Sequence, residues 1–125
     1  MAIPYTIVKQ KNPRNTNQTL YYPRAASNGV VELEEIIYKL EQMSTLSGAD
    51  IEAVLYGLTD LAARELSNGK IVRFGRLGSF RITFEASASE SKETISPDNI
   101  RKAKLRFQPH QRFKQMLSTV EFKEK

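Results

Sequence analysis

Three basic side chains at alternating positions are the residues of this sequence whose types and spacing most clearly suit the binding of a ligand. They lie in the stretch IRKAKLRF, residues 100–107, where basic and apolar residues alternate: Lys102, Lys104 and Arg106. Alternate side chains of a strand share one face and lie about 7 Å apart, a spacing that a phosphate backbone can match. The same pattern keeps one face of an ordinary strand solvated. The alternation is therefore compatible with phosphate binding but does not require it.

The charge of the chain is divided along its length. The 125 residues carry a net charge of +5. Residues 1–30 contribute +4 and residues 69–125 contribute +7, whereas residues 31–68, with 2 basic and 8 acidic side chains, contribute −6. A net positive charge often does no more than keep a protein soluble. Basic segments on both sides of an acidic one, however, favour a polyanionic partner for the outer segments.

Residue types that support catalysis are sparse. His110 is the only histidine and there is no cysteine, which excludes histidine pairs, thiolate metal sites and disulfides. Glu34 and Glu35 are adjacent and diverge around a helix, an arrangement unsuited to paired-carboxylate chemistry. Nucleophile-elbow and phosphate-loop motifs are absent, since GRLG (75–78) is long enough only for a tight turn. We therefore expect a non-enzyme with no metal, no cofactor and no small-molecule substrate.

The N-terminal residues have the pattern of a strand pair. IPYTIVKQ (3–10) and TLYYPRA (19–25) are rich in β-branched and aromatic residues, and a turn-rich loop (11–18) separates them. Their alternating apolar residues are unlike those of a disordered tail. We expect residues 1–29 to form a strand extension packed on a core made by residues 30–125.

Two amphipathic helices follow the strand pair. Apolar residues recur at helical spacing from Val30 to Met43, and again in a longer segment after Ser47. Ser47 and Asp50 form a capping pattern at the start of the second helix, and Asn68-Gly69 ends it. The sequence therefore predicts a helical hairpin.

The next segment predicts a sheet with a long connection. IVRFGRLGSFRITF (71–84) is typical of two strands joined by a turn, for which Gly75 and Gly78 supply unusual backbone angles. Residues 86–99 are polar and without apolar periodicity, so we expect an exposed loop or arm. Residues 100–107 then alternate as a third strand.

The C-terminal residues predict a short helix beginning at Pro109 and a frayed tail, EFKEK (121–125). No apolar run approaches the ~18 residues needed to span a bilayer. The start of the chain, MAIPYTIVKQ, has no signal-peptide pattern and is expected to be the mature N-terminus of a cytoplasmic protein.

The element order and one motif resemble the HU and integration-host-factor family of DNA-bending proteins. The resemblance covers about residues 30–117 and is carried by GKIVRFGRLGSF (69–80) and by RFQP (106–109) before a short helix. Within the first motif, Gly78-Ser79-Phe80 is its most specific part. The N-terminal strands and ISPDNIRKAKLRF (95–107) resemble a divergent, HU-related branch that carries extra strands before the first helix.

The resemblance implies an α+β, HU-like fold: a helical hairpin and a three-stranded antiparallel sheet with a protruding arm, in an intertwined homodimer. It also implies a histone-like, architectural protein of the bacterial nucleoid that binds and condenses duplex DNA largely independently of sequence. The basic residues of the matching strands and last helix are the candidate DNA-binding residues: Arg73, Arg76, Arg81, Arg101, Lys102, Lys104, Arg106, Arg112 and Lys114.

The sequence departs from the HU pattern in the arm. The family's Arg-Asn-Pro tip, whose proline wedges between base pairs, has no counterpart, since the only proline of the arm is Pro97 between Ser96 and Asp98. Thr83 and Glu85 occupy the positions of the family's arm-base arginines. Family lysine positions after the third strand fall on Gln108 and Gln111, whereas Lys114 keeps its charge.

Two functions of different classes remain open. The first is an architectural, homodimeric DNA-binding protein that contacts phosphates, which the charge distribution favours. The second is a structural or protein-interaction module on the HU fold with weak or no DNA binding, which the altered arm favours.

Overall fold

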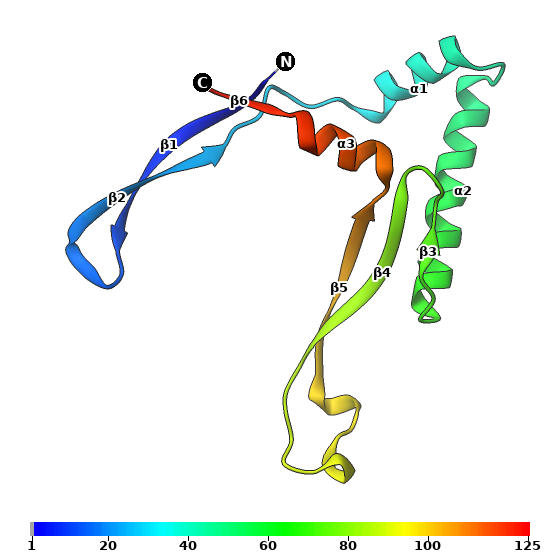
Figure 1. Ribbon diagram of the computed structural model, residues 1–125. Helices are drawn as coiled ribbons and strands as arrows, with labels where there is room; N and C mark the ends of the chain where they lie inside the picture. The colour runs from blue at the N-terminus through cyan, green and yellow to red at the C-terminus, as the bar shows by residue number, and fades with distance from the viewer. Residues whose placement is uncertain (1) are drawn as a thin grey trace.

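Two small sheets and three α-helices form an elongated, hook-shaped chain in the computed structural model, which describes residues 2–125 (Figure 1). Two short 3-10 helices, η1 and η2, lie in the segment between β4 and β5. The elements in chain order are β1 (Ala2–Asn12), β2 (Asn15–Ala25), α1 (Leu33–Met43), α2 (Gly48–Ser67), β3 (Val72–Arg73), β4 (Gly78–Ala86), η1 (Lys92–Thr94), η2 (Pro97–Asn99), β5 (Ile100–Pro109), α3 (Gln111–Thr119) and β6 (Glu121–Glu124).

The first sheet, here the terminal sheet, joins both ends of the chain in the strand order β2-β1-β6. The predicted N-terminal strand pair is present, with Ile7 opposite Pro23, but the strands are longer than expected and only Pro13-Arg14 separate them. The predicted frayed tail is wrong, because residues 121–124 form β6 and pair in parallel with β1. The open edge of β1 offers unpaired backbone groups, and the tail satisfies them.

The helical hairpin is present, with one shifted boundary. α1 begins at Leu33 rather than Val30, because Glu32 has the extended backbone of an N-cap residue (φ −82°, ψ 160°). The start of α2 is as predicted, since the Ser47 side chain accepts a hydrogen bond from the Asp50 N–H at 3.2 Å. Its predicted end is also confirmed, with Gly69 in the left-handed region at φ +82°.

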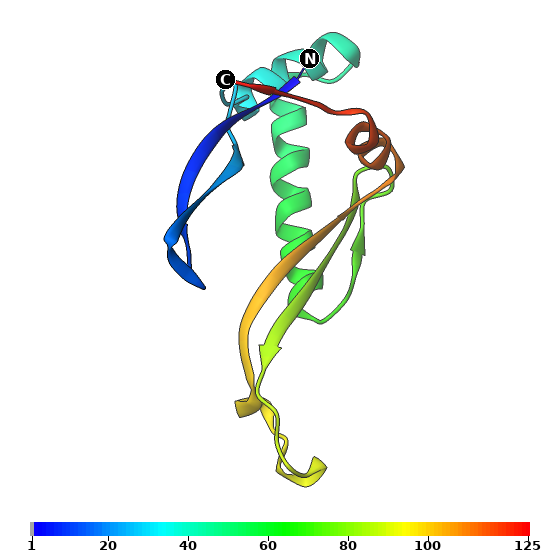
Figure 2. The same ribbon diagram turned by 60° about the vertical axis from the view of Figure 1, so that its left-hand side comes forward.

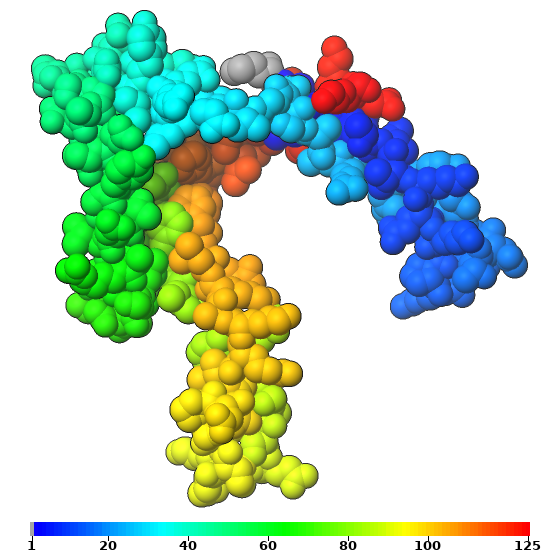
Figure 3. Space-filling model, turned by 180° about the vertical axis from the view of Figure 1, so that it is seen from behind, coloured from blue at the N-terminus to red at the C-terminus, as the bar shows by residue number. Residues whose placement is uncertain are grey.

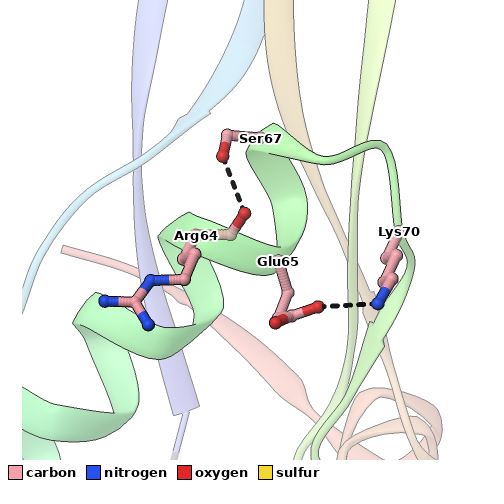
Figure 4. A network of polar contacts seen from close by, with 4 residues as sticks. All are labelled: Arg64, Glu65, Ser67 and Lys70. Carbon is pink, nitrogen blue, oxygen red and sulfur yellow. Dashed lines mark hydrogen bonds and ion pairs between the residues drawn. The ribbon is translucent and has the colours of Figure 1, made fainter.

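Polar contacts at the end of α2 fix the turn into β3 (Figure 4). The Ser67 hydroxyl donates to the Arg64 carbonyl oxygen at 2.7 Å, and Lys70 Nζ pairs with Glu65 Oε2 at 3.2 Å. The Lys70 backbone N–H also donates to the Glu65 carbonyl oxygen at 3.2 Å. The turn therefore places β3 and Arg73 beside α2.

The second sheet, here the central sheet, is the predicted three-stranded antiparallel sheet in the order β3-β4-β5. The connection from β3 to β4 closes with the Phe74 N–H donating to the Gly78 carbonyl oxygen at 2.8 Å. Gly75 and Gly78 have φ of +59° and +141°, as the glycine spacing suggested. A Cβ on Gly78 would overlap the Gln108 carbonyl oxygen and the Phe107 ring, so the close approach of β4 to β5 requires glycine.

A β-bulge interrupts β5 and changes which basic residues share a face. The register runs Thr83 opposite Lys104, but Glu85 lies opposite Arg101, so Lys102 is the extra, unpaired residue. Lys102 has φ +44°, the one positive φ of a non-glycine residue in the described chain. The predicted alternation of Lys102 with Lys104 is therefore wrong, because a bulge shifts the register by one and brings Arg101 into line instead.

A row of aromatic rings in edge-to-face and tilted contact connects the central sheet to α3. The ring centroids of Phe74 and Phe80 lie 5.5 Å apart, those of Phe80 and Phe107 5.0 Å, and those of Phe107 and Phe113 6.2 Å. Contrary to expectation, Pro109 ends β5, and α3 begins after His110 as its N-cap. The contact between Phe113 and Phe107 therefore holds the start of α3 against the end of the sheet where β4 begins and β5 ends.

The core of the single chain is small. Among the described apolar residues only Ile51 and Leu66 of α2 are buried. A hollow of about 330 Å³ remains between α2 and the central sheet, lined by residues such as Leu58 and Leu105, and Leu105 is 61% exposed. The terminal sheet lies apart from α2 and from the central sheet, beside the two chain ends (Figures 1 and 2). The expectation that residues 1–29 pack on a core stays a prediction.

Candidate nucleic-acid interface

One face of the central sheet is polar and basic, whereas the other carries the phenylalanines. Cross-strand partners share a face, so the register identifies the members of this basic face. Arg73 lies opposite Ser79, which lies opposite Gln108. The remaining opposed pairs along β4 and β5 are Arg81–Arg106, Thr83–Lys104 and Glu85–Arg101.

Arg81 and Arg106 are direct cross-strand partners of like charge. Like charges at such positions repel each other and lower the stability of the sheet. The structure gives Arg81 one weak contact, from Nη2 to the Gln108 Oε1 at 3.5 Å, and Arg106 is exposed. The pair would be neutralised by an anion lying across the two strands.

The positive charge of Lys104, the next basic residue on this face of β5, is partly neutralised within the chain. Lys104 Nζ lies 2.7 Å from Glu85 Oε1, with the two side chains 40% and 47% exposed. An ion pair this exposed contributes little to stability. Glu85 therefore reduces the positive charge of the face towards the segment 87–99, as its position in the sequence suggested.

A hollow of about 470 Å³ lies where the basic face meets the start of α3. Three cationic side chains line it, together with the polar side chains of Ser79, Gln108 and His110 and the glycines of the β3–β4 turn. The cationic residues are Arg73, Arg81 and Lys114.

The N-terminus of α3 faces the same region. Its first backbone N–H groups have no partner inside the helix, and the His110 side chain makes no capping hydrogen bond. Lys114 is the first residue whose N–H closes the helix, donating to the His110 carbonyl oxygen at 3.1 Å. A second hollow, of about 780 Å³, also includes His110 and is lined by Arg76 and Arg112. Basic side chains thus flank this helix start in both hollows.

The structure brings together most of the basic residues singled out from the sequence. Five gather around the start of α3: Arg73, Arg76, Arg81, Arg112 and Lys114. Three continue along β5 on the basic face: Arg101, Lys104 and Arg106. Lys102 alone leaves this register, at the bulge.

Sequence reasoning missed the polar groups that complete the first hollow. Ser79 and Gln108 line it beside Arg81, and His110 lies at the junction of both hollows. The GSF motif and the position of His110 before the last helix were visible in the sequence. The meeting of β3, β5 and α3 at one point depends on the tertiary fold.

The helical pair carries an acidic surface distant from the basic one along the chain. Glu32, Glu34 and Glu52 line a hollow of about 350 Å³ together with Tyr56. The Tyr56 hydroxyl donates to Glu52 Oε1 at 2.9 Å, and this hydrogen bond and the carboxylate charge raise the pKa of Tyr56.

Within residues 2–125 there is no cluster of side chains suited to a metal ion. No helix in that range has the length and apolar character to cross a membrane.

A solved structure shares the fold of this chain, and a family model identifies its family. A crystal structure of a candidate bacterial DNA-binding protein from Bacteroides vulgatus ATCC 8482 superposes with a TM-score of 0.65 at 10% sequence identity. The match covers 98% of this chain and 47% of that one, so the present chain spans about half of its length. No curated protein matches the sequence. A family model for HU domains fused to a wHTH, Ig or glycine-rich motif matches residues 1–124. The chain therefore belongs to this HU-related family, HU-HIG.

Proposed function

We propose that this protein is a homodimeric, architectural DNA-binding protein that binds duplex DNA mainly through its phosphates. The observation that carries the proposal is the gathering of basic side chains from β3, β4, β5 and α3 around one helix N-terminus and along one face of the central sheet. Family membership and the fold shared with the B. vulgatus protein support it.

The electrostatics of this face suit a chain of phosphates. The start of α3 combines unpaired N–H groups with the positive end of the helix dipole, which together attract anions. Arg81 and Arg106 add two opposed positive charges farther along the strands. A single small anion would satisfy only one of these positions, whereas a phosphate backbone can follow them in sequence.

Contacts to phosphates fix the position of a protein on DNA without reading its sequence. The basic face is presented mainly by the strands of the central sheet, whose side chains alternate along β4 and β5. We therefore expect binding with little sequence preference. Nucleoid location in the bacterial cytoplasm follows from this function.

The exposed surface of the single chain supports the homodimer. The chain exposes 11075 Å², whereas a compact monomer of 14.2 kDa exposes about 6,800 Å². The excess of about 4,300 Å² is larger than one partner buries in most obligate interfaces. A second copy that intertwines with the first would cover the apolar side chains now exposed on α2 and the central sheet, among them Leu58, Leu61 and Leu105.

The segment 87–99 would engage DNA differently from an HU arm. It contains two 3-10 helices, and Pro97 is the first residue of the second one. The side chains of Ser96 and Asn99 form a capping box around this turn, so Pro97 is held within a 3-10 helix. Glu90, Glu93 and Asp98 outnumber its single Lys92. We expect weaker bending of DNA than an intercalating proline would give.

A titration with duplex DNA at several salt concentrations tests the proposal. If each subunit contacts roughly three or four phosphates, affinity should fall by about 10³-fold or more between ~50 and ~200 mM salt. Duplexes of different sequence should give the same curve. A dimer that shows no binding at ~50 mM salt would exclude this function and leave the alternative, a protein-interaction module whose exposed apolar surfaces bind other proteins.

A further inference from the structure

The terminal sheet has an apolar face that nothing in its own chain covers. Cross-strand partners place Ile3 and Phe122, Tyr5 and Ala25, and Ile7 and Pro23 on one face. Ile7 is 55% exposed and Phe122 65% exposed. A small sheet gains stability only by burying one face, so this one requires a partner surface.

Hydrogen bonds hold the strand ends of the terminal sheet together where the chain enters and leaves it. The Ala26 N–H donates to the Pro4 carbonyl oxygen at 2.9 Å, which fixes the exit from β2. The Lys125 N–H donates to the Tyr5 carbonyl oxygen at 2.9 Å, and Lys125 Nζ donates to the Ser27 carbonyl oxygen at 3.1 Å. β6 also follows α3 directly, so the sheet is attached to the body at two points. The space-filling view shows an open concavity between it and the β4–β5 hairpin (Figure 3).

We propose that this apolar face closes over the α1–α2 pair of a second copy of the chain, as a clasp between subunits. The face contains a hollow of about 630 Å³ lined by Tyr5, Ile7, Tyr21, Pro23, Ala25 and Phe122, and Tyr22, which pairs with Val8 on the other face, contributes to its edge. The inference rests on the proposed homodimer and specifies a contact that the HU-like core alone does not supply.

Charge complementarity identifies the α1–α2 pair as the occupant. Lys9 and Lys11 lie on the same face as Ile7, at the hairpin end of the sheet, and residues 1–30 contain no acidic side chain. The α1–α2 hollow is lined by Glu32, Glu34 and Glu52. Residues 31–68 carry −6 against +4 for residues 1–30, yet the described residues form no ion pair between these segments within one chain.

The apolar surface of the helices matches the requirement of the sheet. Leu33 of α1 is 39% exposed and Tyr56 of α2 is 57% exposed, and both line the α1–α2 hollow with the three glutamates. Leu33 and Tyr56 adjoin acidic residues in this hollow, just as Ile7 and Tyr21 adjoin Lys9 on the sheet. Each surface therefore offers an apolar centre with charges of opposite sign beside it, the arrangement found in specific interfaces.

Zero-length cross-linking of the unmodified protein tests the clasp. Light and isotopically heavy chains are mixed, unfolded and refolded together, and a carbodiimide then joins lysines to carboxylates in direct contact. We expect cross-links from Lys9 or Lys11 to Glu32, Glu34 or Glu52. About half of them should join a light to a heavy chain, because two labels in equal amounts pair at random in a twofold dimer. Cross-links found only within one label, or none in a proven dimer, would overturn the clasp.

A matched pair of substitutions supplies a second measurement. Ile7→Asp places a charge on the apolar face, whereas Thr6→Asp places it on the opposite face of the same strand, opposite Arg24. We expect Ile7→Asp to weaken the dimer at least tenfold in sedimentation experiments and Thr6→Asp to leave it unchanged. If Ile7→Asp leaves the dimer intact and instead weakens binding of single-stranded DNA, the face is a nucleic-acid platform and the clasp is wrong.

These results separate the clasp from the proposed function. A dimer that forms the expected cross-links but binds no duplex DNA would remove the function and keep the clasp. A dimer that binds duplex DNA but forms none of these cross-links would keep the function and remove the clasp. A 14.2 kDa monomer at micromolar concentration would exclude the clasp and the homodimer together.

Discussion

Arg81 of β4 and Arg106 of β5 lie directly opposite each other on the basic face of the central sheet. Two guanidinium groups held in this way lower the stability of the free protein and are neutralised when an anion binds. Removing one of the two arginines should therefore maintain or raise the stability of the free protein but weaken its binding to DNA. This difference separates a binding role from a structural one.

Replacing Arg106 by alanine should weaken DNA binding without lowering stability. We expect the slope of log K against log salt to decrease by about two, because each subunit of a dimer loses one phosphate contact. The melting temperature of the free protein should stay the same or rise, since the repulsion from Arg81 is removed. Fluorescence titrations and thermal melts measure the two effects. An Arg106→Ala protein that binds as tightly as the wild type at every salt concentration would contradict the assignment of this face.

Lys102 should act through the backbone rather than through its charge. Its φ of +44° is costly for a side chain with a Cβ, so Lys102→Gly should raise the free energy of unfolding by about 0.5–1 kcal/mol. The matched control is Arg106→Gly, in regular strand, which should be less stable than Arg106→Ala by about 0.5–1 kcal/mol. Chemical denaturation measures both. A destabilised Lys102→Gly protein would show that the bulge is absent in solution.

Gly78→Ala should destabilise the central sheet strongly. The new Cβ would overlap the Gln108 carbonyl oxygen and the Phe107 ring, and φ at this position is +141°. We expect a loss of about 2–3 kcal/mol in the free energy of unfolding. Gly75→Ala is the control, because a Cβ there meets no atom within 4 Å and only its φ of +59° is unfavourable. Equal effects of the two substitutions would indicate that the close approach of the strands is not the cause.

Leu105→Asp tests whether a second copy covers the apolar face of the central sheet. Leu105 is 61% exposed in the single chain, so a monomer would tolerate the charge. In an intertwined dimer the carboxylate would be buried, and folding and association would fail together. We expect the substituted protein to be largely unfolded by circular dichroism at micromolar concentration. Asn17→Asp, on the exposed part of β2, should fold and dimerise normally. A well-folded Leu105→Asp monomer would refute the predicted coverage.

The sequence by itself determined most of the element types and showed which residues are basic. Helical spacing and the Ser47 cap fixed α2, because capping and apolar periodicity are local properties of the chain. The glycine spacing predicted the turn at Gly75 and Gly78, whose φ angles only glycine adopts easily. The nine candidate DNA-binding residues could be named from the sequence, because an excess of basic residues in a segment is visible without knowledge of the fold.

Only the tertiary structure decided how these residues are grouped. The bulge at Lys102 aligns Arg101 with Lys104, and strict alternation cannot reveal it because it depends on how β5 pairs with β4. The tail became β6 because β1, more than a hundred residues earlier in the sequence, offers an open edge in space. The hollow at α3 likewise forms where three separate segments meet. Local propensity carries no information about such long-range pairing, which is why sequence alone could not supply it.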